Sequence, residues 1–189
     1  MRCGLAAGQA LERPLLRRLR RELRHAEALA VAGRTLRRRD LSTRRLAERL
    51  ESAGVAPAPE RSALQALTHA RLLDDTRLAA ARALALAERG WGDAAIAARL
   101  EAEGIGEADG RQALAGLPAE VARAKKLSRG LGRAKAWALL ARRGFDEDTI
   151  EAVAGSLDAD PGGGLGKPYT THKQTACKGR FFAESESQP

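Results

Sequence analysis

A spacing pattern of glycine and apolar residues occurs three times in this sequence, centred on Gly54, Gly104 and Gly144. Apolar side chains lie four and eight positions before each glycine and ten and thirteen positions after it, and a serine or glycine lies twelve positions before it. The matching positions around the middle glycine are Gly92, Ile96, Leu100, Leu114 and Leu117. Agreement at so many places predicts an internal repeat of roughly 40 to 50 residues. The fold of the chain therefore follows from the fold of one unit.

Each unit has the signals of three short helices. The serine or glycine that lies twelve positions before the central glycine suits a helix N-cap; these residues are Ser42, Gly92 and Gly132. The central glycine suits the left-handed conformation that closes a helix at its C-terminus. The middle helix lies between these two signals, and another helix follows the central glycine. A third helix precedes the cap; in the middle unit it spans Leu73 to Arg89, and Asp74 or Asp75 can cap it.

These units predict an all-α protein with three tandem three-helix repeats in an elongated, curved array. No run of alternating β-branched residues indicates a sheet, and a unit this small must stack on its neighbours to bury enough surface. We predict a basic N-terminal extension, three repeats and a disordered C-terminal tail rich in Gly, Pro, Ser and Thr, over residues 1–26, 27–70, 71–117, 118–157 and 158–189 respectively.

The cysteines and the hydropathy pattern favour a cytoplasmic protein. Cys3 and Cys177 lie near opposite ends of the chain, as expected of free thiols rather than a disulfide framework. No apolar run approaches the roughly 20 residues that span a bilayer. Arg13 and the arginines after it interrupt any signal-peptide core. We therefore expect no membrane association.

Charge is distributed unevenly along the chain. Residues 1–45 contain 13 Arg and 4 acidic residues, residues 46–120 contain 8 basic and 12 acidic residues, and residues 121–143 contain 8 basic residues and no acid. This order predicts an anionic partner, either nucleic acid or an acidic protein surface, that both basic regions contact. The alternative is that these side chains only solvate helix faces. The predicted contact residues are Arg37, Arg38, Arg39, Arg44 and Arg45 in the first region and Lys125, Lys126, Arg129, Arg133 and Lys135 in the second.

Signatures of catalysis are weak. The tail sequence GGGLGKPYTT resembles a phosphate-binding loop only loosely, because Pro168 follows Lys167 where Ser or Thr is required. The histidines are far apart in sequence, so they indicate neither a zinc site nor a catalytic base. Helix capping accounts for the adjacent acids Asp74 and Asp75 without a catalytic role. We expect a protein that is not an enzyme, with no cofactor and no metal.

The middle unit, RLLDDTRLAAARALALAERGWGDAAIAARLEAEGI, resembles the hallmark segment of the RecX family of recombinase regulators. The flanking segments RRRDLSTRRLAERLESAGV and ARRGFDEDTIEAV resemble the first and third repeats of that family, so the resemblance covers about residues 27 to 157. Leu78 departs from the family pattern, which usually has an aromatic residue there, and Gly92 stands where a basic residue or proline is common.

The resemblance implies a regulator of the RecA recombinase. Such a protein binds along the groove of the RecA–DNA filament, restrains its ATPase and strand exchange in DNA repair and recombination, and has weak affinity for single- or double-stranded DNA. We expect it to be monomeric. An alternative interpretation of STRRLAERLESAGV is a helix-turn-helix of a DNA-binding transcriptional regulator. A helical-repeat adaptor without a nucleic-acid role is a third possibility.

Overall fold

The computed structural model describes residues 12–157, and within that range every regular element is an α-helix. The predicted all-α fold class is therefore confirmed. Cys3, Cys177 and the predicted tail lie outside the described residues. The helices are α1 (Arg13–Leu36), α2 (Thr43–Ser52), α3 (Pro57–His69), α4 (Asp75–Glu88), α5 (Asp93–Ala102), α6 (Glu107–Ala115), α7 (Glu120–Leu127), α8 (Arg133–Arg142) and α9 (Glu147–Leu157).

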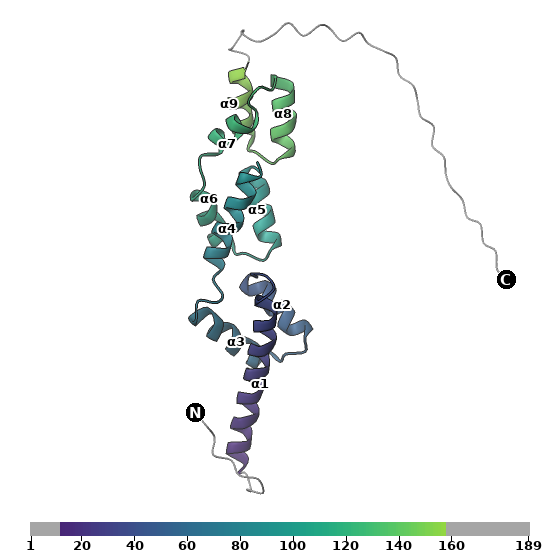
Figure 1. Ribbon diagram of the computed structural model, residues 1–189, viewed down its shortest axis with the longest axis vertical. Helices are drawn as coiled ribbons and strands as arrows, with labels where there is room; N and C mark the ends of the chain where they lie inside the picture. The colour runs from purple at the N-terminus through teal and green to yellow at the C-terminus, as the bar shows by residue number, and fades with distance from the viewer. Residues whose placement is uncertain (1–11, 158–189) are drawn as a thin grey trace, which may run out of the picture. The chain divides into compact units, whose positions relative to one another are not determined.

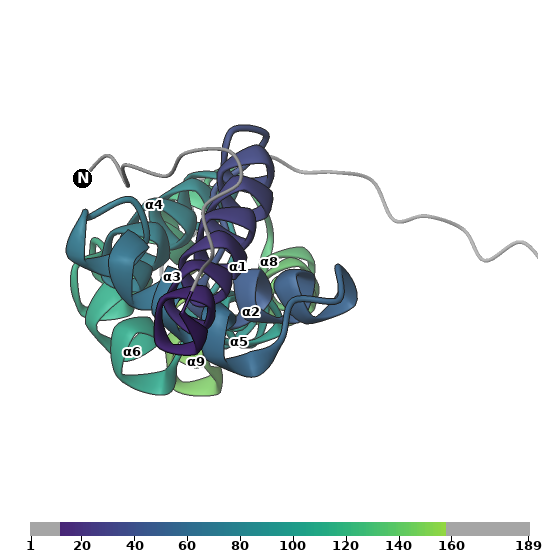
Figure 2. The same cartoon turned by 90° about the horizontal axis from the view of Figure 1, so that it is seen from below.

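The helices pack in three groups of three that follow chain order (Figure 1). Each group has its own apolar core. Leu46 and Leu50 of α2 are central to the first core, Ile96 and Leu100 of α5 to the second, and Leu140 of α8 to the third. Figures 1 and 2 place the middle helices α2, α5 and α8 on the same side of their groups. The predicted repeat boundaries and the curvature of the array remain predictions.

The helix-end signals in the sequence are confirmed. Ser42 caps α2 by accepting a hydrogen bond on Oγ from the Arg45 N–H at 3.2 Å. Asp74 caps α4 in the same way, with Oδ1 2.9 Å from the Arg77 nitrogen. The central glycines Gly54, Gly104 and Gly144 have φ of 77°, 79° and 70°, a conformation that glycine adopts without a Cβ clash.

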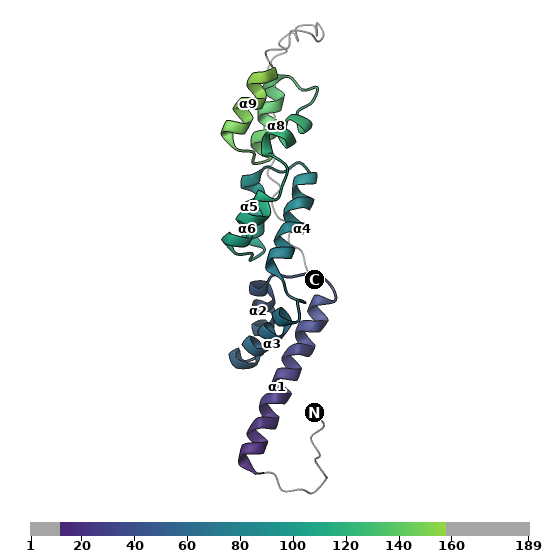
Figure 3. The ribbon, with the colours of Figure 1, turned by 90° about the vertical axis from the view of Figure 1, so that its left-hand side faces the viewer.

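Helix α1 is much longer than the first helices of the other groups. It begins at Arg13, with a proline in its first turn, so the predicted boundary between residues 26 and 27 falls inside a continuous helix. Figure 3 shows its N-terminal turns running past α2 and α3. Its early leucines are consequently poorly covered, and Leu23 is 59% exposed.

Candidate functional site

The first predicted basic cluster surrounds the turn between α1 and α2. Arg37 is the C-cap of α1, and Arg38 and Arg39 follow it in the turn. Arg44 and Arg45 lie in the first turn of α2. All five side chains are exposed, as a surface that binds an anionic partner requires.

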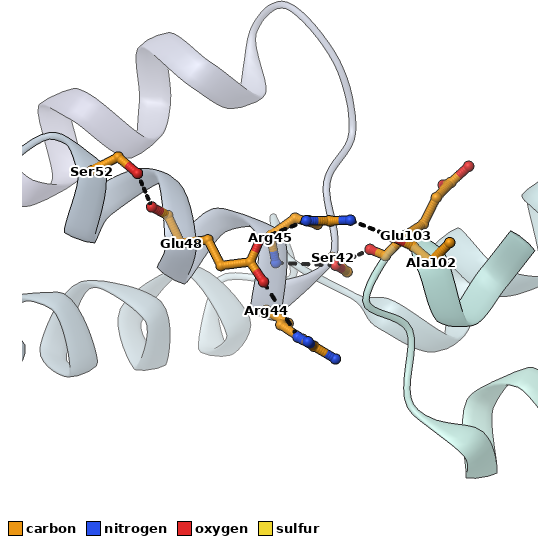
Figure 4. Close-up of polar contacts among 7 residues, drawn as sticks. All are labelled: Ser42, Arg44, Arg45, Glu48, Ser52, Ala102 and Glu103. Carbon is orange, nitrogen blue, oxygen red and sulfur yellow. Dashed lines mark hydrogen bonds and ion pairs between the residues drawn. The ribbon is translucent and has the colours of Figure 1, made fainter.

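Arg44 and Arg45 already have a carboxylate partner, whereas no ion pair within residues 12–157 involves Arg37, Arg38 or Arg39. Arg45 Nη1 lies 2.7 Å from Glu48 Oε2, and Arg44 Nε lies 3.3 Å from Glu48 Oε1 (Figure 4). The hydrogen bond from Arg45, helped by both guanidinium charges, lowers the pKa of Glu48. These two arginines therefore carry less uncompensated charge than the sequence suggests.

Arg45 also joins the first group of helices to the second. Its Nη2 donates to the carbonyl oxygen of Ala102 at the end of α5. Beside it, Ser42 Oγ donates to the Glu103 carbonyl oxygen at 2.7 Å (Figure 4), and the Thr43 N–H donates to Asp75 Oδ1 at 2.8 Å. The N-terminal end of α2 is thus docked on the second group, which makes Arg45 a structural residue.

A basic groove lies between α1 and α2, and we define it by Arg34, Arg38, Arg39 and Arg49. It has a volume of about 400 Å³, and no acidic residue lines it. Among residues 12–157, none forms an ion pair with these four guanidinium groups. The adjoining groove, of about 560 Å³, shares Arg39 and Arg49 but also has Asp40, Glu48 and Glu103 in its walls.

Two members of the basic groove, Arg34 and Arg49, were not among the predicted contact residues. The sequence did contain a signal for them, because Arg34 comes shortly before Arg37, Arg38 and Arg39, in the last turn of α1, and Arg45 and Arg49 are four apart on α2. Residues at that spacing share one face of a helix. Only the packing of α1 against α2 brings Arg38 and Arg49 to one groove.

The second predicted cluster lies in the third group. Lys125 and Lys126 are in the last turn of α7, Arg129 is in the following turn, and Arg133 and Lys135 begin α8. All five are exposed. The two clusters belong to different groups of helices, so the structure does not combine them into one site.

Arg123 and Arg143, which also lie in the basic run 121–143, have structural roles. Arg123 forms an ion pair with Asp93 and donates from Nη1 to the Trp91 carbonyl oxygen at 2.8 Å. Arg143 donates to the Arg89 carbonyl oxygen at 2.8 Å. Burial raises the pKa of Asp93, against the opposing effect of Arg123. These contacts join the second group to the third.

Comparison with known proteins identifies the family. No family model matches the sequence. The regulatory protein RecX of Halorhodospira halophila is 30% identical to this chain over 141 residues, which is 69% of this chain and 88% of that protein. This chain belongs to the RecX family. The family resemblance read from the three repeated segments is thereby confirmed.

Solved RecX structures share the fold. RecX from Lactobacillus salivarius superposes with a TM-score of 0.67 at 17% identity, covering 72% of this chain and 98% of that one. A second structure, of regulatory protein RecX, gives a TM-score of 0.66 at 21% identity and covers 80% of this chain and 81% of that one. The chain is therefore a RecX-type regulatory protein with the helical fold of that family. Within residues 12–157, no helix has the length and apolar character needed to cross a bilayer.

Proposed function

We propose that this RecX-family chain binds the filament that RecA forms on DNA and restrains its ATPase and strand exchange, without catalysing a reaction itself. Family membership supports the regulatory role. A filament on DNA presents phosphates and protein surface together, so a chain with separate basic regions can contact it at more than one point. A DNA-bound partner also places the protein in the cytoplasm.

The basic groove is the observation that carries the proposal. Its guanidinium groups lack carboxylate partners within the described residues, so no internal ion pair has to break when an anion binds. Arginine presents a planar fork of donors that matches two oxygens of a phosphate. Contacts of this kind to the DNA backbone are independent of sequence and weaken as salt rises.

The exposed residues Lys125, Lys126 and Arg129 supply the second contact in this proposal. They lie on α7 and the turn after it, two groups of helices away from the basic groove. Each contact alone gives weak binding to free DNA, and a filament that both contacts reach binds a monomer more tightly.

The helix-turn-helix alternative is less well supported. In that motif the N-terminal residues of the recognition helix contact base edges in the major groove. If α2 were that helix, Ser42 and Arg45 would have to face DNA, but both donate to carbonyl oxygens of the second group. The acid-free groove lined by Arg34, Arg38, Arg39 and Arg49 suits contact with phosphates better than readout of bases.

The test is inhibition of DNA-dependent ATP hydrolysis by RecA across a salt series. The variant Arg38→Glu/Arg49→Glu reverses two charges of the basic groove. The control variant Arg61→Glu/Arg77→Glu changes the net charge equally at exposed arginines outside that groove. Both pairs lie on helix faces or turns where side chains are exposed, so neither change should unfold the chain.

We expect the groove variant to need at least about tenfold more protein for half-inhibition at low salt, since the loss of even one hydrogen bond to a charged group costs about 1.5–3 kcal/mol. The difference from wild type should narrow as salt rises. The control should inhibit like wild type. If both variants lose inhibition equally, the effect comes from net charge and not from the basic groove. If the wild-type chain does not inhibit RecA at any salt concentration, the proposed function is refuted.

A further inference from the structure

The solvent face of α8 differs from the matching faces of α2 and α5. We compare the residues that lie three, six and seven positions before the central glycine of each group. These residues are Glu51, Glu48 and Ala47 in α2, Glu101, Ala98 and Ala97 in α5, and Ala141, Ala138 and Trp137 in α8. On α8, alanine thus replaces the acids of the other two helices, and a tryptophan replaces their alanine.

The core of the third group does not require Trp137. Its side chain is 38% exposed, whereas Leu140, on the next turn of the same helix, is buried. Alanine occupies the same place in the first two groups, so a repeat packs without an aromatic residue here. The other aromatic residues within 12–157 are at least partly covered, since Phe145 is buried and the Arg99 guanidinium lies 3.8 Å from the centroid of the Trp91 ring. An exposed ring that the fold does not need points to a ligand.

A strip of alanines and then two cations lie beside Trp137 on this face. Residues three or four apart in a helix share a face, because successive residues are about 100° apart. By this spacing the alanines adjoin one another and the tryptophan; they are Ala134, Ala138 and Ala141. Lys135 and Arg142 are three and four positions from the central alanine and form the opposite edge of the strip. The alanines and both cations are exposed.

We propose that this face of α8 is a stacking platform for single-stranded DNA. An unpaired base lies on the Trp137 ring, and phosphates of the same strand contact Lys135 and Arg142. An aromatic ring combined with cations that follow the backbone is a common means of binding single strands without reading their sequence. In a duplex, neighbouring bases cover both faces of each base. The ring is therefore available only to an unpaired strand.

Charge favours DNA over a protein segment as the occupant. A helix of another protein could also lie on an alanine strip, but such a partner gives no reason to exclude acids from this face. A polyanion does give that reason. Residues 121–143 contain 8 basic residues and no acid. Lys125, Lys126 and Arg129 belong to the same group of helices and add to its positive field.

This inference extends the second contact of the proposed function from phosphates to bases. It predicts a preference for single strands, which phosphate contacts in the basic groove would not give by themselves. It concerns DNA binding by the free chain, so it does not rest on RecA being the partner and can be tested without RecA.

Tryptophan fluorescence tests the stacking directly. In a Trp91→Phe chain, whose folding circular dichroism checks, Trp137 is the only tryptophan. Titration with an oligothymidylate of about 16 nucleotides, the upper end of the usual size of one such site, should quench its emission. An abasic oligomer of the same length presents the phosphates without bases and should leave the emission unchanged. The matching duplex should quench several-fold less than the single strand.

Anisotropy of a dye-labelled oligothymidylate measures the contribution to affinity. All chains carry Arg38→Glu/Arg49→Glu, so that the basic groove does not mask the effect. Trp137→Ala should weaken binding at least about fivefold, the lower end of the effect of losing one stacked base. Trp137→Phe should keep most of the affinity, whereas Trp137→Leu should lose it. Leu84→Ala, which removes another exposed apolar side chain, should bind like its parent.

Three results would overturn the proposal. They are equal quenching by the abasic oligomer or the duplex, unchanged affinity after Trp137→Ala, and full affinity of Trp137→Leu. The last result would indicate an apolar surface of the kind that contacts a protein. Because RecA is absent from both experiments, none of these results bears on inhibition of RecA. A chain that stacks on single strands but does not inhibit RecA would keep this inference and refute the proposed function.

Discussion

The junction between the second and third groups should depend on the absence of one side chain at Gly92. A Cβ added at Gly92 would lie 2.2 Å from the Gly144 oxygen and 2.3 Å from the Phe145 nitrogen. Both are backbone atoms at the closed end of α8, so no side chain can rotate away to make room. Gly92→Ala should therefore force the third group off the N-terminus of α5.

The chain contains a matched control for this change. Gly132 is also an N-cap glycine, with φ and ψ of −73° and 158° against −79° and 166° at Gly92, but a Cβ there meets nothing within 4 Å. Both alanine variants share the loss of cap preference, which cancels in the comparison. Overpacking costs about 1–3 kcal/mol, and the lost Gly92 to Arg143 hydrogen bond adds about 1 kcal/mol. Gly92→Ala should thus be about 2–4 kcal/mol less stable than Gly132→Ala.

Urea denaturation followed by far-ultraviolet circular dichroism measures this difference. Hydrogen exchange should also show earlier exchange in α7–α9 of the Gly92→Ala variant, while α1–α3 stay protected, because only one junction is lost. Equal stability of the two variants, within about 0.5 kcal/mol, would refute the role assigned to this close approach.

Three further changes have defined outcomes. Leu100→Ala should cost about 2–5 kcal/mol in a urea melt, because this side chain is 2% exposed, whereas Leu84→Ala, at 48% exposed, should cost far less. Deleting residues 159–189 should leave helical content and inhibition of RecA intact, and reduced cooperativity of unfolding would contradict this. Since Arg45 lowers the pKa of Glu48, the small stabilisation from this pair is complete above the ordinary value near 4.5 and is lost as pH falls below it. Glu48→Gln should therefore lower the free energy of unfolding slightly at neutral pH but not in acid. Urea melts at the two pH values measure the difference.

The helices were predictable because their ends are encoded locally. Ser42 and Asp74 cap the helices that the sequence assigned to them, and the central glycines adopt the left-handed conformation. Capping and C-terminal closure depend on a few consecutive residues, so spacing alone finds them. The length of α1 was harder to define, since Leu15 and Leu23 in its N-terminal half are exposed and no buried apolar face marks where the helix begins within the described residues.

The candidate site was only partly predictable, because the role of an arginine depends on the residues that packing brings near it. Arg45 was predicted as a contact residue, but its guanidinium donates a hydrogen bond to the Ala102 carbonyl oxygen, 57 residues away in sequence. Arg123 lies in the same basic run as Lys125 and Lys126, yet its guanidinium is held against Asp93. No local signal distinguishes these residues from Arg38, which lines an open groove.

The same contacts explain part of the alternation of charge along the chain. Asp75 and Glu120 lie at the two junctions between groups, where each accepts a hydrogen bond from the first N–H of a middle helix. Glu103 forms an ion pair with Arg82 next to the first junction. Part of the acidic charge of residues 46–120 therefore belongs to the two junctions. The two predicted basic clusters lie in the first and third groups, at the turn between α1 and α2 and along α7 and the start of α8. We therefore expect an anionic partner to contact the first and third groups, whereas some acids of the middle group serve the internal junctions.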